Sequence, residues 1–316
     1  MLGALIIDKP EGITSHGVVA RIRRVAGTRR VGHAGTLDPF ATGVLVVCMD
    51  RATRLVQFLV GLDKEYIARV RLGYATDTQD RTGKQITPLR TSNELSLEDL
   101  KQVLDEFTGT QPQIPPMFSS KKVDGERLYR AARAGREVER EPVSVTIHSI
   151  EVINDVEPAL DITEDGTAEF SMSVRCGSGT YIRTLAHDVG ERLGVGAHLV
   201  ELRRMAVGHF RIDDALKLSE VEPMSRDEVA HKLISPSAML AHLRALNLED
   251  ERVAMISNGR SILLQEHEAA SINDCDAPIR LCDAAGRLAA VGDYDSRLKL
   301  VKPRVVLAGE VVDRLR

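Results

Sequence analysis

The order of strand-like and helix-like segments is the feature that most restricts the fold of this chain. From Tyr66 to Leu72 apolar side chains alternate with more polar ones, which is typical of a half-exposed strand. Further strand patterns occupy 44–48, 143–153 and 170–175, and helical patterns occupy 15–25, 96–107 and 180–193. Because these segments show no regular βαβ alternation, they predict an α+β fold with a mostly antiparallel sheet flanked by helices.

Capping residues delimit two of these helices. Ser15 is predicted to cap the first helix, which Gly27 ends. Thr180 is predicted to cap the later helix, which Gly194 ends. Both assignments use the preference for a hydroxyl at the start of a helix and for glycine just beyond its end.

A second unit is expected near the end of the chain. From about Leu246 short strand patterns alternate with turns, and residues 279–291 have the pattern of a hairpin. Residues 235–237, Ser-Pro-Ser, give a weak linker signal ahead of this region. We therefore predict two domains, residues 1–240 and residues 246–316, the second a small β-barrel-like domain.

Composition is that of a globular protein outside the membrane. Of 316 residues, 43% are hydrophobic and 28% are charged, which suits a sizeable core. No apolar stretch approaches the roughly 20 residues of a membrane helix, and Asp8–Pro10 follow the first apolar run too early for a signal peptide. The four cysteines stand at 48, 176, 275 and 282. Their spacing fits no zinc site and predicts reduced thiols in a cytoplasmic protein.

Charge is unevenly distributed along the chain. The net charge is −4, yet residues 1–60 hold eight Lys and Arg against four Asp and Glu, and residues 151–170 hold seven acids and no base. Five arginines stand at 21, 23, 24, 29 and 30. Such a run is either a solvated helix face or a surface that binds phosphates.

The segment from Gly32 to Gly43, GHAGTLDPFATG, is predicted as a loop ahead of a buried strand. It lacks the Lys-Ser/Thr pair of a phosphate-binding P-loop. Asp38 precedes Pro39, which favours an extended backbone at the aspartate. A carboxylate fixed there is either a nucleophile or the cap of a turn, which is the commoner role of Asp in such loops.

Several motifs together resemble the stand-alone bacterial tRNA pseudouridine-55 synthase family. The catalytic motif of that family is matched by residues 32–45, GHAGTLDPFATGVL. Further matches follow in the same order at 64–66, 73–83, 113–135, 176–183 and 196–210. The resemblance covers residues 1 to about 211, and the residues from Leu246 resemble, more weakly, the small RNA-binding β-barrel called PUA.

This resemblance implies a catalytic group of three residues. Asp38 would be the catalytic carboxylate. Arg183 would be its ion-pair partner, and such a partner typically lowers the pKa of an Asp by roughly 1–3 units. Tyr66 would stack on the uracil, and its hydroxyl is a candidate base near C5.

It also implies residues that bind the substrate. His33 would fill the gap left by a flipped uridine, whose extrusion costs a few kcal/mol. Lys64 is a basic position near the site, and Tyr181 and Leu202 complete the expected contacts. The expected partner is tRNA, bound by its T-arm and, through the C-terminal module, by its acceptor stem. No protein partner is implied, and a monomer is expected.

The implied reaction converts uridine-55 in the T loop to pseudouridine with an Asp nucleophile and base flipping. The C1′–N1 bond is broken and the base rejoins through C5, so no atom is gained and no cofactor or metal is expected. Asp63, Asp77 and Asp80 lack the spacing of a calcium loop and are predicted as turn caps. The alternatives are a non-catalytic tRNA-binding protein, a guide-RNA-dependent synthase and a metal-dependent hydrolase. Asp38 argues against the binding protein, and segment 113–135 argues against the guide-RNA-dependent synthase. The lack of a ligand cluster in the sequence argues against the hydrolase.

Overall fold

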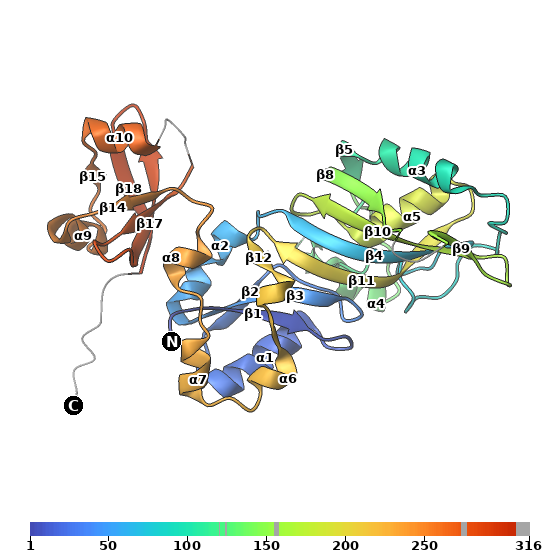
Figure 1. Ribbon diagram of the computed structural model, residues 1–316, viewed down its shortest axis with the longest axis horizontal. Coiled ribbons are helices and arrows are strands. Elements are labelled where there is room, and N and C mark those ends of the chain that lie inside the picture. The colour runs from blue at the N-terminus through green and yellow to red at the C-terminus, as the bar shows by residue number, and fades with distance from the viewer. Residues whose placement is uncertain (120, 124, 155–157, 273–276, 308–316) are drawn as a thin grey trace.

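The fold is centred on one large mixed sheet, seen in a computed structural model that describes residues 1–119, 121–123, 125–154, 158–272 and 277–307 (Figure 1). Among these residues its eleven strands are β1 (Gly3–Lys9), β2 (Val31–Ala34), β3 (Thr42–Met49), β4 (Lys64–Leu72), β5 (Gly109–Gln113), β8 (Val143–Val152), β9 (Leu160–Ile162), β10 (Ala168–Cys176), β11 (Ala197–Val207), β12 (Phe210–Arg211) and β13 (Leu216–Lys217). The main order is β13-β1-β3-β11-β4-β10-β8-β5. In the described part of this sheet, β1 with β13 and β3 with β11 are the parallel pairs, which confirms the predicted α+β class with a mostly antiparallel sheet.

Helices cover the sheet along its length. They are α1 (Ser15–Ala26), η1 (Asp50–Leu55), α2 (Val56–Leu59), α3 (Leu97–Glu106), α4 (Leu128–Arg133), α5 (Ile182–Arg192), η2 (Ile212–Asp214), α6 (Leu218–Val221), α7 (Arg226–His231) and α8 (Pro236–Met239). A short hairpin of β6 (Lys122–Val123) and β7 (Glu126–Arg127) precedes α4. The helix α1 packs against β1 and β3, and α3 and α5 share a core with β4, β8, β10 and β11.

Both predicted helix caps are wrong by one residue. Thr14, not Ser15, accepts the capping hydrogen bond from the Gly17 N–H, because Ser15 is already helical and its side chain is buried. The helix α5 begins at Ile182, and Thr180 instead donates to the Gly177 carbonyl at 3.0 Å. A hydroxyl residue near a helix start therefore does not fix which residue is the cap.

The predicted loop is shorter than Gly32–Gly43. Residues 31–34 pair antiparallel with 46–49 and form β2, so His33 lies on a strand and the loop covers 35–41. Gly43 shows why the sequence is glycine-rich here. Its φ is +102°, and a Cβ would lie 2.2 Å from the carbonyl oxygen of Arg204 on the neighbouring β11. The tight approach of β3 to β11 beside the loop requires glycine at this position.

The C-terminal residues form a separate curled sheet, as predicted. Its strands, in the order of pairing, are β14 (Ala245–Asn247), β16 (Ile279–Cys282), β17 (Leu288–Asp295), β18 (Leu300–Val306) and β15 (Ile262–Leu263), with helices α9 (Asp250–Ser257) and α10 (Glu266–Ile272) beside them. The hairpin predicted over 279–291 is the antiparallel pair β16–β17.

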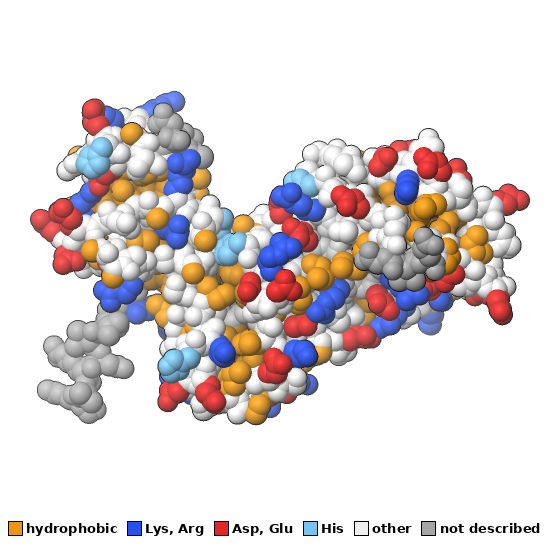
Figure 2. Space-filling model, in the orientation of Figure 1, with side chains coloured by type: hydrophobic (Ala, Val, Ile, Leu, Met, Phe, Trp, Pro, Cys, Tyr) orange, Lys and Arg blue, Asp and Glu red, His pale blue; other side chains and the backbone are white. Residues whose placement is uncertain are grey.

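This C-terminal unit packs on the N-terminal end of the large sheet. Val291 and Val305 share one apolar cluster with Val44, Leu55 and Leu59. Polar contacts flank that cluster, since Arg54 donates to the Val306 carbonyl at 2.8 Å. Figure 2 shows the surface hollowed between the C-terminal unit and the far half of the large sheet. The two units are thus joined by a shared core as well as by the chain.

Two further sequence predictions concern the cysteines and the membrane. Cys48, Cys176 and Cys282 are buried free thiols, as expected, and Cys275 lies outside the described residues. No helix in the described part of the chain has the length and apolar character needed to cross a membrane.

Candidate active site

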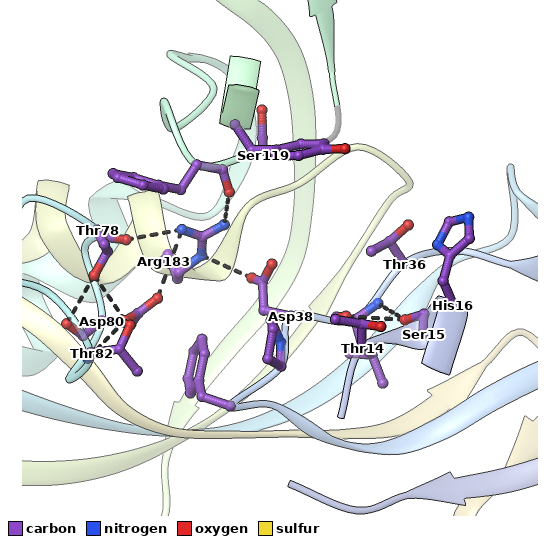
Figure 3. Close-up of a pocket in the computed structure, with 15 residues that line it drawn as sticks. Thr14, Ser15, His16, Thr36, Asp38, Thr78, Asp80, Thr82, Ser119 and Arg183 are labelled. Carbon is purple, nitrogen blue, oxygen red and sulfur yellow. Dashed lines mark hydrogen bonds and ion pairs between the residues drawn. The ribbon is translucent and has the colours of Figure 1, made fainter. Parts of the chain in front are cut away.

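Asp38 lies where two pockets meet. The larger pocket, of about 600 Å³, is lined from α1, the 35–41 loop and the 78–82 turn (Figure 3), and also by Phe118, Ser119 and Tyr129. The smaller, of about 240 Å³, opens toward β4, β11 and the start of α5. Its lining includes six of the seven predicted site residues, namely Asp38, Lys64, Tyr66, Tyr181, Arg183 and Leu202. The structure therefore brings together side chains that are up to 164 positions apart (202 minus 38).

The carboxylate of Asp38 is paired with a buried guanidinium. The Nε atom of Arg183 lies 2.9 Å from Oδ2 of Asp38, and the Arg183 side chain is 4% exposed. The other two nitrogens of Arg183 donate to the carbonyls of Thr78 at 2.9 Å and Phe118 at 2.8 Å. Asp80 contributes a second carboxylate 3.8 Å from Nη1. Arg183 is consequently not the surface residue that its place in the first turn of α5 would otherwise suggest.

Burial changes the expected ionisation of Asp38. Burial raises the pKa of this carboxyl above its ordinary value, and the charge and hydrogen bond of Arg183 oppose the rise without cancelling it. The nearby charge of Asp80 adds to the rise. Arg183 lowers the pKa of Asp38, as expected of an ion-pair partner, but burial has the larger effect and the pKa stands above its ordinary value. Arg183 thus limits the rise in the pKa of Asp38 that burial of its carboxyl causes.

The backbone around Asp38 is held at every carbonyl from residue 35 to residue 39. The donors are Arg204 to the carbonyls of Gly35 and Thr36, Ser15 to Leu37, the Ala41 N–H to Asp38, and both the Gly12 N–H and Lys9 to Pro39. Ser15 also accepts the Leu37 N–H at 2.9 Å. Buried backbone groups must find partners, and here the partners come from three separate segments. The loop is thereby fixed on both sides of its carboxylate.

Arg204 is a central residue to which the sequence analysis assigned no role. It is 1% exposed, donates to the Val44 carbonyl at 2.8 Å, and forms a hydrogen bond with Tyr66. A signal was present, because Leu202, Arg204 and Ala206 share the buried face of β11. An arginine at an inward-facing position of an apolar strand indicates a buried charge that has its own hydrogen-bond partners. Ser15 and Lys9 left no comparable pattern.

Tyr66 and Lys64 reach the smaller pocket from the start of β4. Burial raises the pKa of the Tyr66 phenol, and Arg204 opposes that rise. Burial lowers the pKa of Lys64 to about 8, and its ammonium group donates to the carbonyls of Val60 and Leu62 at 2.7 and 2.6 Å. Lys64 therefore holds the turn before β4.

The remaining predicted contacts differ in position. Leu202 and Tyr181 both line the smaller pocket, and Gln113 bonds the Tyr181 backbone at both its N–H and its carbonyl. His33 lines neither pocket. Its ring instead lies edge-on to the ring of His16, with 5.2 Å between centroids, and His16 lines the larger pocket. Burial lowers the pKa of His33 to about 4, so its ring is neutral.

The three aspartates considered as a metal loop do not meet in one place. Asp80 accepts hydrogen bonds from Thr78 and Thr82, and Asp77 accepts the Lys84 N–H, so both cap turns as predicted. Asp63 is not a cap, because its carboxylate pairs with His148 at 3.1 Å and with Arg175 at 3.7 Å. Within the described ranges, no group of three or more His, Cys, Asp or Glu is arranged to hold a metal ion.

Two family models match the chain. Residues 23–182 match the TruB family pseudouridylate synthase N-terminal domain, and residues 183–245 match the tRNA pseudouridylate synthase B C-terminal domain. The first match contains the loop of Asp38 and the strand of Tyr66, and Arg183 is the first residue of the second.

Curated relatives and solved structures agree with these matches. The chain is 36% identical over 307 residues to tRNA pseudouridine synthase B of Bacillus pumilus, covering 97% of each chain. It is 44% identical over 260 residues to that of Geobacter sulfurreducens, covering 82% of each. A chain in the crystal structure of a Cbf5–Nop10–Gar1 complex superposes with a TM-score of 0.70 at 25% identity, covering 97% of this chain and 85% of that one. A chain in an H/ACA RNP bound to a substrate RNA containing 2′-deoxyuridine gives 0.68 at 23% identity, covering 98% and 86%.

Proposed function

Since the chain belongs to the TruB family of pseudouridylate synthases, we propose that it isomerises uridine-55 in the T loop of tRNA to pseudouridine. The observation that carries the proposal is Asp38, fixed where the two pockets meet and paired with Arg183 at 2.9 Å. A purely RNA-binding protein gains nothing from a carboxylate held rigidly in a pocket that would face phosphates. The choice of tRNA rests on the names of the relatives, and the choice of nucleotide rests on the resemblance of residues 32–45 to the pseudouridine-55 synthases.

The geometry suits Asp38 as the nucleophile. The ion pair engages Oδ2, and in Figure 3 that contact uses one carboxylate oxygen and leaves the other for the substrate. The carboxylate attacks C1′, and the C1′–N1 bond breaks with its electrons passing to the uracil. After the base turns, C5 bonds to C1′ as the carboxylate leaves, and the proton on C5 is lost while N1 gains one. Every atom of the uridine is retained, as an isomerase requires.

The smaller pocket is proposed to hold the flipped uracil. Its walls include the Tyr66 ring and the Leu202 side chain, which are 8% and 7% exposed and can contact the two faces of a planar base. Tyr181 closes the side toward α5. Extruding the base costs a few kcal/mol, and stacking on an aromatic ring offsets about 1–3 kcal/mol of this cost. We propose that His33 fills the space that the flipped nucleotide leaves in the RNA. The ring of His16 packs edge-on against His33 and supports it in that position.

Residues 246–316 are proposed to form an RNA-binding module that contacts the acceptor stem, and residues 1–240 to form the catalytic domain. In support, the strands of the large sheet end at β13, and the curled second sheet begins at β14 (Ala245–Asn247). Two exposed basic residues, Arg297 in the turn before β18 and Lys302 on β18 itself, could contact phosphates. A substrate that spans both units would cross the hollow between them that Figure 2 shows.

A modification assay tests the proposal directly. The purified protein is incubated with an unmodified tRNA transcript, and pseudouridine is mapped at single-nucleotide resolution. We expect modification at position 55 alone. A transcript with cytidine at that position is the matched control and should remain unmodified. Pseudouridine at another position would refute the nucleotide assignment, and binding without any pseudouridine would favour the non-catalytic alternative.

A further inference from the structure

The first helix and the turn behind it carry a run of positive charge that the proposed chemistry does not use. Between Gly12 and Leu37 the chain has five arginines and two histidines and no acidic residue. All five arginines, at 21, 23, 24, 29 and 30, are exposed. None of them lines either of the pockets that border Asp38. Their place on α1 and before β2 therefore calls for another explanation.

Few of these guanidinium groups are neutralised within the protein. Arg21 pairs with Glu222 at 3.0 Å, and Arg23 donates to the Val31 carbonyl at 2.9 Å. In the part of the chain that the structure describes, the side chains of residues 24, 29 and 30 make no ion pair or hydrogen bond with protein. Asp50, whose backbone N–H donates to the Arg30 carbonyl, uses its carboxylate to bind Thr28 at 2.6 Å and the terminal amine at 3.1 Å. The chain as a whole has a net charge of −4, so these arginines form a local excess of positive charge.

These arginines lead away from the active site. The helix α1 and strand β2 lie side by side and run in opposite directions, since His16 contacts His33 at one end and Arg23 reaches Val31 at the other. From His16 to Arg23 the helix rises about 10 Å. His16 lines the larger pocket beside Asp38, so the charged surface starts at the pocket mouth. Beyond it, Arg54 of η1 reaches the carbonyl of residue 306 in the C-terminal sheet.

We propose that Arg23, Arg24, Arg29 and Arg30, here called the α1–β2 arginine face, bind backbone phosphates of the RNA strand beside the flipped nucleotide. This inference rests on the proposed function, because it takes the RNA to enter the pocket at His16. Guanidinium groups match phosphate oxygens with two parallel hydrogen bonds. Such contacts position an RNA without reading its sequence. The face would hold the strand on its way between the active site and the C-terminal unit.

The salt dependence of binding tests the face. Each phosphate contact contributes about 0.7–0.9 to the slope of log K against log salt. Arg29→Gln with Arg30→Gln should therefore reduce the magnitude of the slope by about 1.4–1.8 in filter binding to a tRNA transcript. Lys101→Gln with Arg192→Gln removes the same charge from α3 and α5 at the far end of the sheet and should leave the slope unchanged. Arg29→Lys with Arg30→Lys retains the charge and should retain most of the slope.

The outcomes separate this surface from the proposed reaction. A Gln pair with the slope of the wild type, or a control pair with an equal loss, would overturn the arginine face. If the wild type formed pseudouridine and the Gln pair had an unchanged slope, the arginine face would be refuted while the proposed function would stand. If no pseudouridine formed but the slope fell as expected, the proposed function would fail and the surface would stand. Melting temperatures of all pairs show whether each variant is folded, and the Lys pair remains informative if the Gln pair is not.

Discussion

Replacing Ser15 with alanine should damage catalysis through a residue that never touches the substrate base. The Ser15 hydroxyl, on a residue 1% exposed, donates to the Leu37 carbonyl at 3.0 Å and accepts the Leu37 N–H at 2.9 Å. Leu37 directly precedes Asp38. The substitution removes the hydroxyl that serves both groups and leaves the N–H and the carbonyl of buried Leu37 with water as their remaining partner.

The size of the effect follows from those two groups. Each buried backbone group left without a partner costs about 1–3 kcal/mol. Leu37 borders both pockets, which admit water, so we take the lower end and expect the free energy of unfolding to fall by about 2 kcal/mol. A domain stable by about 5–15 kcal/mol remains folded. Displacing the carboxylate of Asp38 by about 1 Å should lower the single-turnover rate about 100-fold.

Ser96→Ala is the matched control, because Ser96 caps α3 far from the site and accepts the Asp99 N–H. Its loss should cost about 1 kcal/mol and leave the rate unchanged. Single-turnover rates at saturating protein, binding constants for tRNA and denaturant unfolding are measured for both variants. If Ser15→Ala loses stability as expected but reacts within twofold of the wild type, the two hydrogen bonds between Ser15 and the Leu37 backbone do not position Asp38. Weaker binding at an unchanged saturated rate would also contradict the reasoning.

Three further substitutions probe the site and the C-terminal unit. Arg183→Lys should retain a small fraction of the rate, since the guanidinium reaches Asp38 and two carbonyls through three separate nitrogens of a planar fork, whereas an ammonium carries its donors on a single nitrogen. Because burial raises the pKa of Asp38 and Arg183 limits the rise, the rate should fall as pH drops through that pKa, and the acid limb of Arg183→Gln should lie at higher pH than that of the wild type; coincident limbs would contradict this. Tyr66→Phe should keep tRNA affinity, because it retains the ring that lines the smaller pocket, and should lose catalysis, because it removes the hydroxyl that is the candidate base; a fully active Tyr66→Phe would leave stacking as its role. Arg297→Gln with Lys302→Gln should weaken binding of whole tRNA more than of a T-arm hairpin, and an equal loss on both would argue against acceptor-stem contact.

Local patterns predicted the strands β3, β4, β8 and β10 of the large sheet and the helices α1, α3 and α5, but not the long strand β11. Alternation along β4 (Lys64–Leu72) gave both the strand and its buried face, because one side of an antiparallel strand meets the core. The strand β2 was missed as well, since Val31–Ala34 is only four residues long and gains its structure from pairing with β3. Pairing partners distant in sequence leave little trace in a four-residue window.

The site was predicted less evenly. The motif resemblance identified Asp38, Tyr66 and Arg183, and the structure places all three around the smaller pocket. The raised pKa of Asp38 was not predictable, because it depends on how much water the assembled walls exclude. The roles of Ser15 and Arg204 also depend on the fold, since each bonds backbone more than 20 positions away in sequence. Contacts of a side chain with distant backbone leave no periodicity to read.

Asp38→Asn tests the central claim most directly, because it keeps the shape of the side chain and an oxygen that can accept from Arg183 while removing the nucleophilic charge. With Asp105→Asn on α3 as the matched control, pseudouridine at position 55 is measured in a single turnover alongside the affinity for tRNA. We expect Asp38→Asn to bind tRNA as the wild type does and to form no pseudouridine, and the control to react normally. Turnover at the wild-type rate in Asp38→Asn would contradict the account.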